Sequence, residues 1–370
     1  MAKVFQLRQE SALNFSYEQL LSTVKLDAPL IVGGMRCHGG FDADGIYRSP
    51  RTMWRVPAIE AWQQQHLATS VVPLVEITAD CVPPHLPSVA QAKLMLKHGV
   101  REPIVRMLTE IAIIEGFGAT IRDLPVPPLA SFVRESTAAT ALGHLTGGLF
   151  EAHARDEAGW GEEGGHKQMW EAARDVAFSN PDVPADILMM IMGRRSSQNR
   201  PQRLLPTLAE PVERLLGFMA GVLAIEVFAR STFQWAEELL GDPEVSDSPE
   251  QAAHLVSYIR SDESPHVEYL RTVLSEVAAR TLITADGGEM AGREAVNAML
   301  ERSLKMMIRQ RIRDRRDQVR SSIRAAAAGK VADVEELAAQ FDALETPWEA
   351  PAFARVEPAG APPAAGQVGY

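Results

Sequence analysis

The sequence predicts an all-α fold, a helical bundle preceded by an irregular N-terminal extension. From about residue 96 onward, apolar residues recur at three- and four-residue intervals, which is the period of an amphipathic helix. Few segments alternate between apolar and polar residues, as the strands of a half-buried sheet would. The chain of 370 residues is 46% hydrophobic and 23% charged, so it is long and apolar enough to bury a sizeable core.

The N-terminal region, residues 1–95, is expected to form an irregular cap or collar on the bundle. Five glycines lie between positions 33 and 45 and six prolines between positions 50 and 87, and both residue types interrupt long elements. A short helix is predicted at 57–67, where Pro57 would occupy the first helical position. A cover of this size suits an enzyme that has to shape and enclose a substrate pocket.

The bundle is predicted to extend over residues 96–345, with the core of a metal site at 129–280. Proline and glycine clusters separate its helices. The tail, residues 346–370, contains five prolines and seven alanines and is predicted to be disordered or extended. The expected helices are 101–116, 129–158, 166–179, 208–240, 249–280, 291–328 and 331–344.

Charge and cysteine content argue against several functions. A net charge of −11 argues against nucleic-acid binding, which needs clustered Lys and Arg, and against docking on anionic lipid. With only Cys37 and Cys81, the chain cannot carry a disulfide scaffold or a four-cysteine zinc site. We therefore expect a cytoplasmic protein that binds neither nucleic acid nor a membrane.

Neither a secretory signal nor a membrane span is expected. The first 20 residues lack a long apolar run. The most apolar segment, 215–229, is shorter than the roughly 20 residues that a span requires, and it contains Glu226. We interpret this segment as a buried helix.

Glu226 lies on the apolar stripe of the helix predicted at 208–240. A carboxylate in such a position is costly to bury unless it is paired or bound to a metal. The stripe consists of residues that follow one another at three- and four-residue steps, namely Leu215, Met219, Val222, Glu226, Ala229 and Phe233.

Glu263 and His266 lie together on the apolar stripe of the next helix. A Glu-x-x-His sequence in a helix places a carboxylate and an imidazole one turn apart, where both can bind the same metal. Glu226 and Glu263 are each about 14 residues from the turn between their helices, so an antiparallel pair would bring them level. Carboxylates suit hard cations, and imidazole completes the coordination while leaving positions open for O2.

Glu226 and the Glu-Ser-Pro-His sequence at 263–266 together resemble the second half of the ferritin-like di-iron carboxylate proteins. That superfamily includes O2-activating oxygenases, oxidases, desaturases and iron-storage proteins. The resemblance covers residues 129–280 and implies a ferritin-like bundle. It also implies that Glu226, Glu263 and His266 bind one or both of two iron ions, with manganese as the alternative metal.

Pro265 leaves two local conformations open. Because it lacks a backbone N–H, it could kink the helix beside the metal. Alternatively, Ser264 could cap a new helix with Pro265 at its first position. The second conformation would spoil the one-turn spacing of Glu263 and His266.

The first half of the site is expected from an earlier helix pair. One apolar stripe continues into His153 and Glu157, another begins with His166, and a Gly-rich break separates the two. We predict that His153, Glu157 and His166 complete the two-iron site, with Glu135 and Glu163 as rival ligands.

These residues predict an O2-dependent non-heme di-iron oxidase or oxygenase that acts on a small organic substrate. The protein would supply orientation and a dry pocket for the chemistry. An external electron donor and a second copy of the chain are conceivable partners. The side chains expected to line the pocket are Phe218, Met219, Phe233 and Trp170.

Two other functions are compatible with the same residues. The chain could be a non-catalytic helical binding or assembly protein in which Glu226 and Glu263 pair with Arg230 or Arg260. It could also be a heme-oxygenase-like helical di-metal oxidase, which likewise uses Glu and His on bundle helices. The order of ligands along the helices separates that enzyme from a ferritin-like one.

Overall fold

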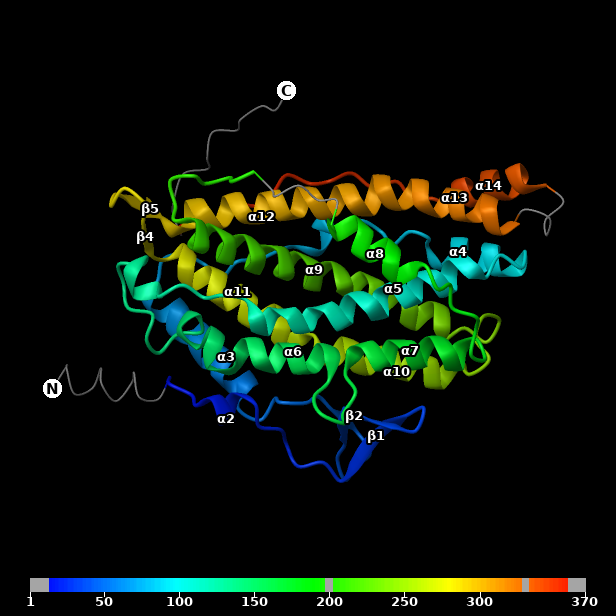
Figure 1. Ribbon diagram of the computed structural model, residues 1–370, viewed down its shortest axis with the longest axis horizontal. Helices are drawn as coiled ribbons and strands as arrows, with labels where there is room; N and C mark the ends of the chain where they lie inside the picture. The colour runs from blue at the N-terminus through cyan, green and yellow to red at the C-terminus, as the bar shows by residue number, and fades with distance from the viewer. Residues whose placement is uncertain (1–12, 197–201, 328–332, 359–370) are drawn as a thin grey trace.

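Helices make up most of the chain in the computed structural model, which describes residues 13–196, 202–327 and 333–358. The prediction of a mainly helical fold is confirmed, and two small antiparallel sheets are the departure from an all-α protein. Figure 1 shows the long helices running side by side along the longest axis of the molecule. They are α5 (Glu102–Gly118), α7 (His166–Ala177), α9 (Glu210–Leu240), α10 (Pro249–Asp262), α11 (Ser264–Ala278) and α12 (Gly292–Arg309).

Proline and glycine set several helix ends. Pro103, Pro211 and Pro249 lie in the first turns of α5, α9 and α10, where a missing backbone N–H costs nothing. Helix α9 ends at Gly241. Helices lie where they were predicted, within a few residues at each end, for 101–116, 166–179, 208–240 and 331–344.

The helix predicted at 129–158 is wrong over most of its length. Only α6 (Phe150–Ala158) is α-helical, and short 3-10 turns and a π-turn at Leu145–Leu149 precede it. Gly148 has a φ of 136°, a conformation that a regular helix does not contain. The carboxylate of Glu276 accepts two backbone N–H groups of this segment, which replaces the missing helical hydrogen bonds.

Two predicted helices are interrupted. The helix at 249–280 breaks at Glu263, which keeps helical dihedral angles (φ −74°, ψ −21°) between α10 and α11. The helix at 291–328 is divided into α12 and α13 (Arg315–Ala327) by a π-turn at Gln310–Asp314. Both predictions are correct in position but miss the break.

The N-terminal region is more regular than predicted. Strands β1 (Ala28–Val32), β2 (Met35–Phe41) and β3 (Tyr47–Arg48) form an antiparallel sheet in that order. Helix α3 (Arg55–Thr69) confirms and extends the helix predicted at 57–67. It packs against α11, and β2 pairs with the loop before α7, so the region covers one side of the bundle.

Smaller elements and the C-terminal segment complete the fold. The described part of the tail, 346–358, is extended, and its Val356 is buried and exchanges two hydrogen bonds with the side chain of Asn297. Residues 359–370, for which disorder or extension was predicted, lie outside the described residues. The smaller elements are α2 (Tyr17–Leu20), α4 (Val89–Lys97), α8 (Ile187–Ser196), α14 (Val334–Ala343), β4 (Thr281–Ile283) and β5 (Glu289–Ala291).

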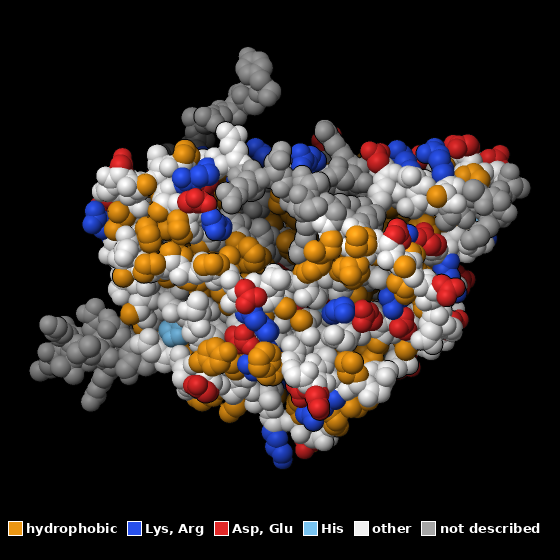
Figure 2. All heavy atoms as spheres, viewed as in Figure 1, with side chains coloured by type: hydrophobic (Ala, Val, Ile, Leu, Met, Phe, Trp, Pro, Cys, Tyr) orange, Lys and Arg blue, Asp and Glu red, His pale blue; other side chains and the backbone are white. Residues whose placement is uncertain are grey.

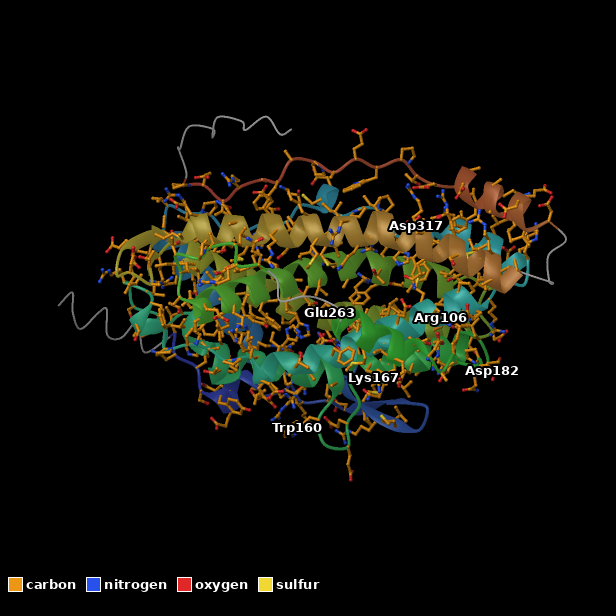
Figure 3. All side chains as sticks on the ribbon, turned by 45° about the horizontal axis from the view of Figure 1, so that its top comes forward. Arg106, Trp160, Lys167, Asp182, Glu263 and Asp317 are labelled. Atoms are coloured by element: carbon orange, nitrogen blue, oxygen red, sulfur yellow. The ribbon has the colours of Figure 1, made fainter. Side chains whose placement is uncertain are left out.

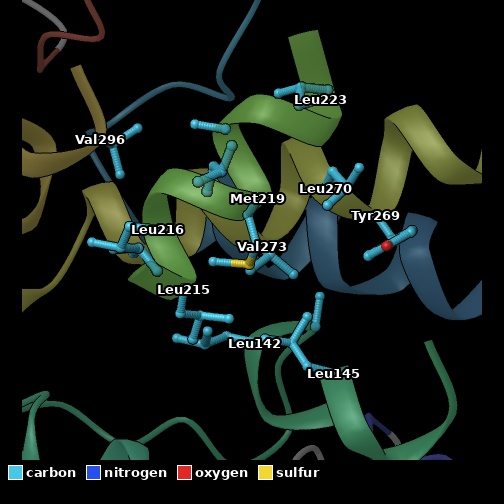
Figure 4. Packing of buried hydrophobic residues seen from close by; sticks show 14 of the residues in the cluster. Leu142, Leu145, Leu215, Leu216, Met219, Leu223, Tyr269, Leu270, Val273 and Val296 are labelled. Carbon is cyan, nitrogen blue, oxygen red and sulfur yellow. The ribbon is translucent and has the colours of Figure 1, made fainter. Parts of the chain in front are cut away.

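Two hydrophobic clusters lie along α9 and enclose a polar zone. The N-terminal half of α9, through Leu223, packs in the cluster that Figure 4 shows around Met219. The C-terminal half, from Phe233, packs in a second cluster. Glu226 lies between them, level with a group of buried histidines and carboxylates. Two hydrophobic cores therefore flank the polar groups.

The apolar segment 215–229 is part of α9, and most of its large side chains are buried, as expected for a core helix. Among the described helices, none combines the length and the hydropathy that crossing a membrane requires.

Candidate metal centre

The six side chains predicted as metal ligands lie together in the middle of the bundle. Each is at most 6% exposed. Figure 3 shows Glu263 near the centre of the molecule, surrounded by helices. The six are His153 and Glu157 on α6, His166 on α7, Glu226 on α9, and Glu263 and His266 at the α10–α11 junction.

One group consists of His153, Glu157, Glu226 and His266, which each offer a ligand atom within 4.8 Å of the others. Nε2 of His153 is 3.4 Å from Oε1 of Glu157 and 3.5 Å from Oε1 of Glu226. Nδ1 of His266 is 3.3 Å from the same oxygen of Glu157. Two imidazoles and two carboxylates therefore surround one small volume.

A second group lies beside the first and adds Glu115 of α5, which the sequence analysis did not select. It consists of Glu115, Glu157, His166 and Glu263. Nδ1 of His166 is 3.5 Å from oxygens of both Glu115 and Glu157, and 2.9 Å from Oε1 of Glu263. One imidazole and three carboxylates surround this volume.

Glu157 and Glu263 face both groups. Oε1 of Glu157 is turned to the first group and Oε2 to the second. Oε2 of Glu263 is 2.7 Å from Nδ1 of His266, and its Oε1 approaches His166. Carboxylates whose two oxygens face neighbouring sites are the ligands of paired cations in helical bundles. The seven side chains thus offer two adjacent sites with two shared carboxylates.

The loop between α6 and α7 explains how Glu157 and His166 meet. Helix α6 ends at Ala158, and Gly159 (φ 78°) turns the chain where any Cβ would lie 2.1 Å from the carbonyl oxygen of Glu163. The loop then returns so that His166 is the first residue of α7. A turn that requires glycine therefore positions both ligands.

The break between α10 and α11 preserves the Glu-x-x-His geometry. The backbone N–H of His266 donates to the carbonyl oxygen of Glu263, and their side chains approach to 2.7 Å. Ser264 does not act as the helix cap, because Glu263 occupies that position. A new helix does begin beside Pro265, but Ser264 is its first residue and Glu263 its cap, and the one-turn spacing that this conformation was expected to spoil is kept.

The ring nitrogens that face away from the shared carboxylates have polar partners of their own. Such partners fix the tautomer and the orientation of a metal-binding imidazole. The pairs are Nε2 of His266 with Oδ2 of Asp156 (3.0 Å), Nε2 of His166 with Oδ2 of Asp262 (3.4 Å), and Nδ1 of His153 with the hydroxyl of Tyr269 (3.1 Å).

The N-terminal region holds Asp156 in place. Nε of Arg51 donates to Oδ1 of Asp156 at 2.6 Å, and Nη1 of Arg55 lies 2.7 Å from Oδ2. Both arginines are buried, and together with His266 they hold the pKa of Asp156 well below its usual range although burial alone would raise it. The cap thus contributes charges to the site and not only a cover.

The same region also holds Asp262. Nε2 of His38 lies 3.1 Å and the hydroxyl of Tyr47 2.9 Å from its Oδ2. Burial alone would raise the pKa of Asp262, but its bonds to His166 and His38 lower it to about 2. Asp262 is therefore a carboxylate at neutral pH that is hydrogen-bonded to His38 and Tyr47 and lies close to His166.

Charges within the site shift its pKa values strongly. Burial lowers the pKa values of His166 and His266, but the carboxylate of Glu263 and its neighbours outweigh it and raise both well above the ordinary value. Burial raises the pKa of Glu157, but the imidazoles hold it well below its usual range. At Glu263, burial and the charge of Glu157 raise the pKa, but the neighbouring imidazoles outweigh both and lower it to about 2. These two carboxylates are therefore ionised at neutral pH.

Glu115 and Glu226 show the opposite shift. Burial and the charges of Glu157 and Glu263 raise the pKa values of both well above the usual range. The site thus holds more carboxyl groups than its imidazoles can neutralise. A pair of divalent cations would supply the missing positive charge, because metal binding favours the deprotonated form of each ligand.

Unsatisfied polar atoms give a second indication of a cation. Both ring nitrogens of His166 and Oε1 of Glu263 lack a hydrogen bond of acceptable geometry in the described structure, although Nδ1 and Oε1 are 2.9 Å apart. Buried polar atoms normally have partners. Imidazole and carboxylate donors fit iron or manganese, so the residues present match the expected metals.

The rival ligands and arginine partners considered from the sequence lie elsewhere. Glu135 accepts hydrogen bonds from the backbone and hydroxyl of Thr281, and Glu163 pairs with Arg36. Arg260 pairs with Glu237 and not with Glu263. Arg230 lies on an exposed position of α9.

The structure does not bring the four predicted pocket residues to one pocket. Phe218 lines a surface pocket of about 520 Å³ between α9 and α12. Met219 is fully buried in the first hydrophobic cluster, and Trp170 and Phe233 pack on each other in the second, with ring centroids 5.5 Å apart. Figure 2 shows hydrophobic side chains gathered on the face where Figure 1 draws α8 and α9.

Three acidic residues were missed by the sequence analysis. Glu115 follows Ile104, Leu108 and Ile111 at helical spacing, so it could have been found as a carboxylate at the end of an apolar stripe. Asp156 and Asp262 each directly precede a glutamate that was predicted as a ligand. Helical periodicity gave no reason to assign a role to the aspartate of each pair as well.

Comparisons with known proteins do not extend this picture. A scan of protein-family models, a search of curated proteins and a search of solved structures each found no match.

Proposed function

We propose that this protein is an O2-dependent non-heme di-iron oxidase or oxygenase that acts on a small organic substrate. The observation that supports this function is the pair of adjacent ligand groups, which share Glu157 and are connected by Glu263 through its contacts with His166 and His266. Manganese is the alternative metal, since the same donors suit it. A ferritin-like arrangement of the helices belongs to the proposal as well.

The side chains have distinct roles in this proposal. Bound iron would supply O2 activation. Glu157 and Glu263 would hold both ions, while Asp156 and Asp262 would fix the rings of His266 and His166 from behind. The hydrophobic clusters on both sides would keep bulk water away from the reaction.

One observation favours the heme-oxygenase-like alternative. A ferritin-like di-iron bundle takes a Glu-x-x-His sequence from each of two helices. Here the first half departs from that rule, because His166 comes from a different helix than Glu157. A heme-oxygenase-like di-metal oxidase is therefore the second candidate, and it shares the iron chemistry of the first.

A non-catalytic role is the third candidate. His166 and His266 already form close contacts with carboxylates, so a network of buried ion pairs could hold the bundle together without iron. Iron content separates this role from both enzymes.

The first test is the iron content of protein loaded anaerobically with Fe(II). We expect about two irons per chain in the wild type and loss of both in Glu263→Ala/His266→Ala, because the two residues contribute to both groups. The loaded wild type should then consume O2, and the rate should rise with the correct substrate in a screen of small organic molecules.

Glu276→Gln is the matched control. Glu276 is a buried carboxyl group on α11 like the ligands, but it caps the backbone near residue 141 and lies outside both groups. This variant should retain two irons. Absence of iron from wild-type protein with native helicity by circular dichroism would reject the oxidase and leave the ion-pair network.

A further inference from the structure

Tyr47 is a half-buried phenol whose only contact with the proposed metal centre so far described is with Asp262. Its hydroxyl donates a hydrogen bond to Oδ2 of Asp262 at 2.9 Å. The same oxygen lies 3.4 Å from Nε2 of His166, whose other nitrogen faces the shared carboxylates. A single carboxylate oxygen therefore joins a phenol to a candidate metal ligand.

The ring of Tyr47 continues the connection outward. It stacks on the ring of Tyr258, with centroids 4.3 Å apart and an interplanar angle of 17°. Tyr258 in turn faces His254, with centroids 6.0 Å apart at 21°. Phe41 contacts both tyrosines edge-on and encloses the stack.

The outer end of this chain opens to solvent. His254 is exposed, and His254, Tyr258 and Phe41 line a surface groove of about 730 Å³ between β1, β2 and α10. In Figure 1 the sheet lies directly beside α10. An unbroken series of aromatic and hydrogen-bonding groups thus leads from the surface to the middle of the bundle.

We infer that Tyr47 and Tyr258 form a relay that carries single electrons between this groove and the metal centre. The inference rests on the proposed function, because O2 chemistry at iron consumes electrons that an external donor has to replace. In the relay, Tyr47 gives one electron toward the metal pair and its phenolic proton to Asp262. Tyr258 returns one electron to Tyr47, and the proton moves back from Asp262.

The electron and the proton that Tyr258 loses are both replaced at the surface. A one-electron donor in the groove restores Tyr258, whose half-buried hydroxyl exchanges its proton with water. The net result is one electron transferred inward with no proton consumed by the relay. Asp262 suits the proton step because its Oδ2 accepts the hydrogen bond of the phenol at 2.9 Å.

A photochemical experiment tests the relay without iron. Of the nine histidines, only His98 and His254 are exposed. In a His98→Gln background, a ruthenium complex can be attached to His254 and oxidised by a laser flash in the presence of an electron acceptor. We expect a tyrosyl radical signal by electron paramagnetic resonance, because the proton of Tyr47 has an acceptor.

Variants locate the radical. Tyr47→Phe should lose the long-lived signal, and Tyr258→Phe should slow its formation. Tyr269→Phe is the matched control: Tyr269 is likewise a phenol beside the site, but it bonds to His153 and has no ring contact with Tyr258, so the signal should persist. Ruthenium at His98 in a His254→Gln background should give no signal. Persistence of the signal in Tyr47→Phe, or its absence in labelled wild type, would overturn the relay.

The same labelled protein tests the connection between Tyr47 and the proposed metal centre. After anaerobic loading with Fe(II), the radical should decay faster, because iron gives one electron to Tyr47 and the proton returns from Asp262. Unchanged decay in protein shown to hold two irons would contradict the connection to the metal centre. Failure to bind iron would reject the proposed function instead, while the radical in metal-free protein would still report on the tyrosines.

Discussion

Glu157 is surrounded by imidazoles on two sides, and this position explains its ionisation. His153 and His266 approach one oxygen and His166 the other, each within 3.5 Å. Burial would otherwise raise the pKa of a carboxyl group without counterions. Its ionised form is therefore maintained by the same side chains with which it would share two cations.

Glu276 illustrates the opposite case. Burial raises its pKa from 4.5 to about 7, although the N–H groups of Ala141 and Leu142 donate to it and act in the other direction. A carboxyl group with a higher pKa in the folded state binds its proton more tightly there. Protonation therefore stabilises the fold, and this contribution is lost as the pH rises from about 4.5 to about 7.

We expect Glu276→Gln to remove this pH dependence. The free energy of unfolding of the wild type minus that of the variant should fall by up to about 3 kcal/mol between pH 4.5 and pH 8. Urea unfolding of both proteins at several pH values measures the difference. A difference that stays constant over this range would show that the carboxyl group titrates at its ordinary pKa in the folded protein.

At the scale of elements, the close approach of α5 and α6 determines where Glu157 points. A Cβ at Gly118, the last residue of α5, would lie 2.4 Å from Cγ of Glu157. No side chain other than hydrogen fits there while Glu157 keeps its position. The helix ends can therefore approach closely enough for a residue on each, Glu115 and Glu157, to share one ligand group.

Gly118→Ala should therefore displace Glu157 and lower the iron content below two per chain while the helical content is retained. Gly116→Ala is the matched control, because its Cβ would meet only the side chain of Lys167, with Cδ at 2.9 Å, and no candidate ligand. Iron analysis and circular dichroism of the two variants provide the measurement. Full iron content in Gly118→Ala would show that Glu157 is not needed where the structure places it.

For the whole molecule, the N-terminal region and the bundle share buried charges. Arg55 is fully buried and lies 2.7 Å from Asp156, which in turn contacts His266. Removal of one partner from a buried ion pair leaves the other charge without compensation. The cap and the metal centre should therefore depend on each other for stability.

Arg55→Met is expected to lower the free energy of unfolding of the metal-free protein by about 3–5 kcal/mol. Arg55→Met/Asp156→Asn should recover part of the loss, because the unpaired charge is then absent. Arg48→Met, which removes a half-exposed pair with Asp42 in the same region, should cost about 1 kcal/mol or less. Equal losses in Arg55→Met and Arg48→Met would contradict the coupling of the cap to the bundle.

The helical class, most helix positions and six of the seven side chains that meet in the centre could be predicted from the order of amino acids alone. This was possible because helical periodicity is local, and because a glutamate or histidine on an apolar stripe stands out from its neighbours. Glu226, Glu263 and His266 were found in this way.

Which groups share a site, and which residues support them, follows from long-range contacts in the folded protein. Asp156 and Asp262 carry no local signal that distinguishes them from other acidic residues, and contacts across more than 100 residues place Asp156 against His266. Gly148, just before α6, has a backbone conformation that interrupts the helix predicted at 129–158 and that periodicity does not report. The partners of Asp262 lie on strands of the N-terminal region. Helical spacing does not predict where strands so far away in the sequence will pack.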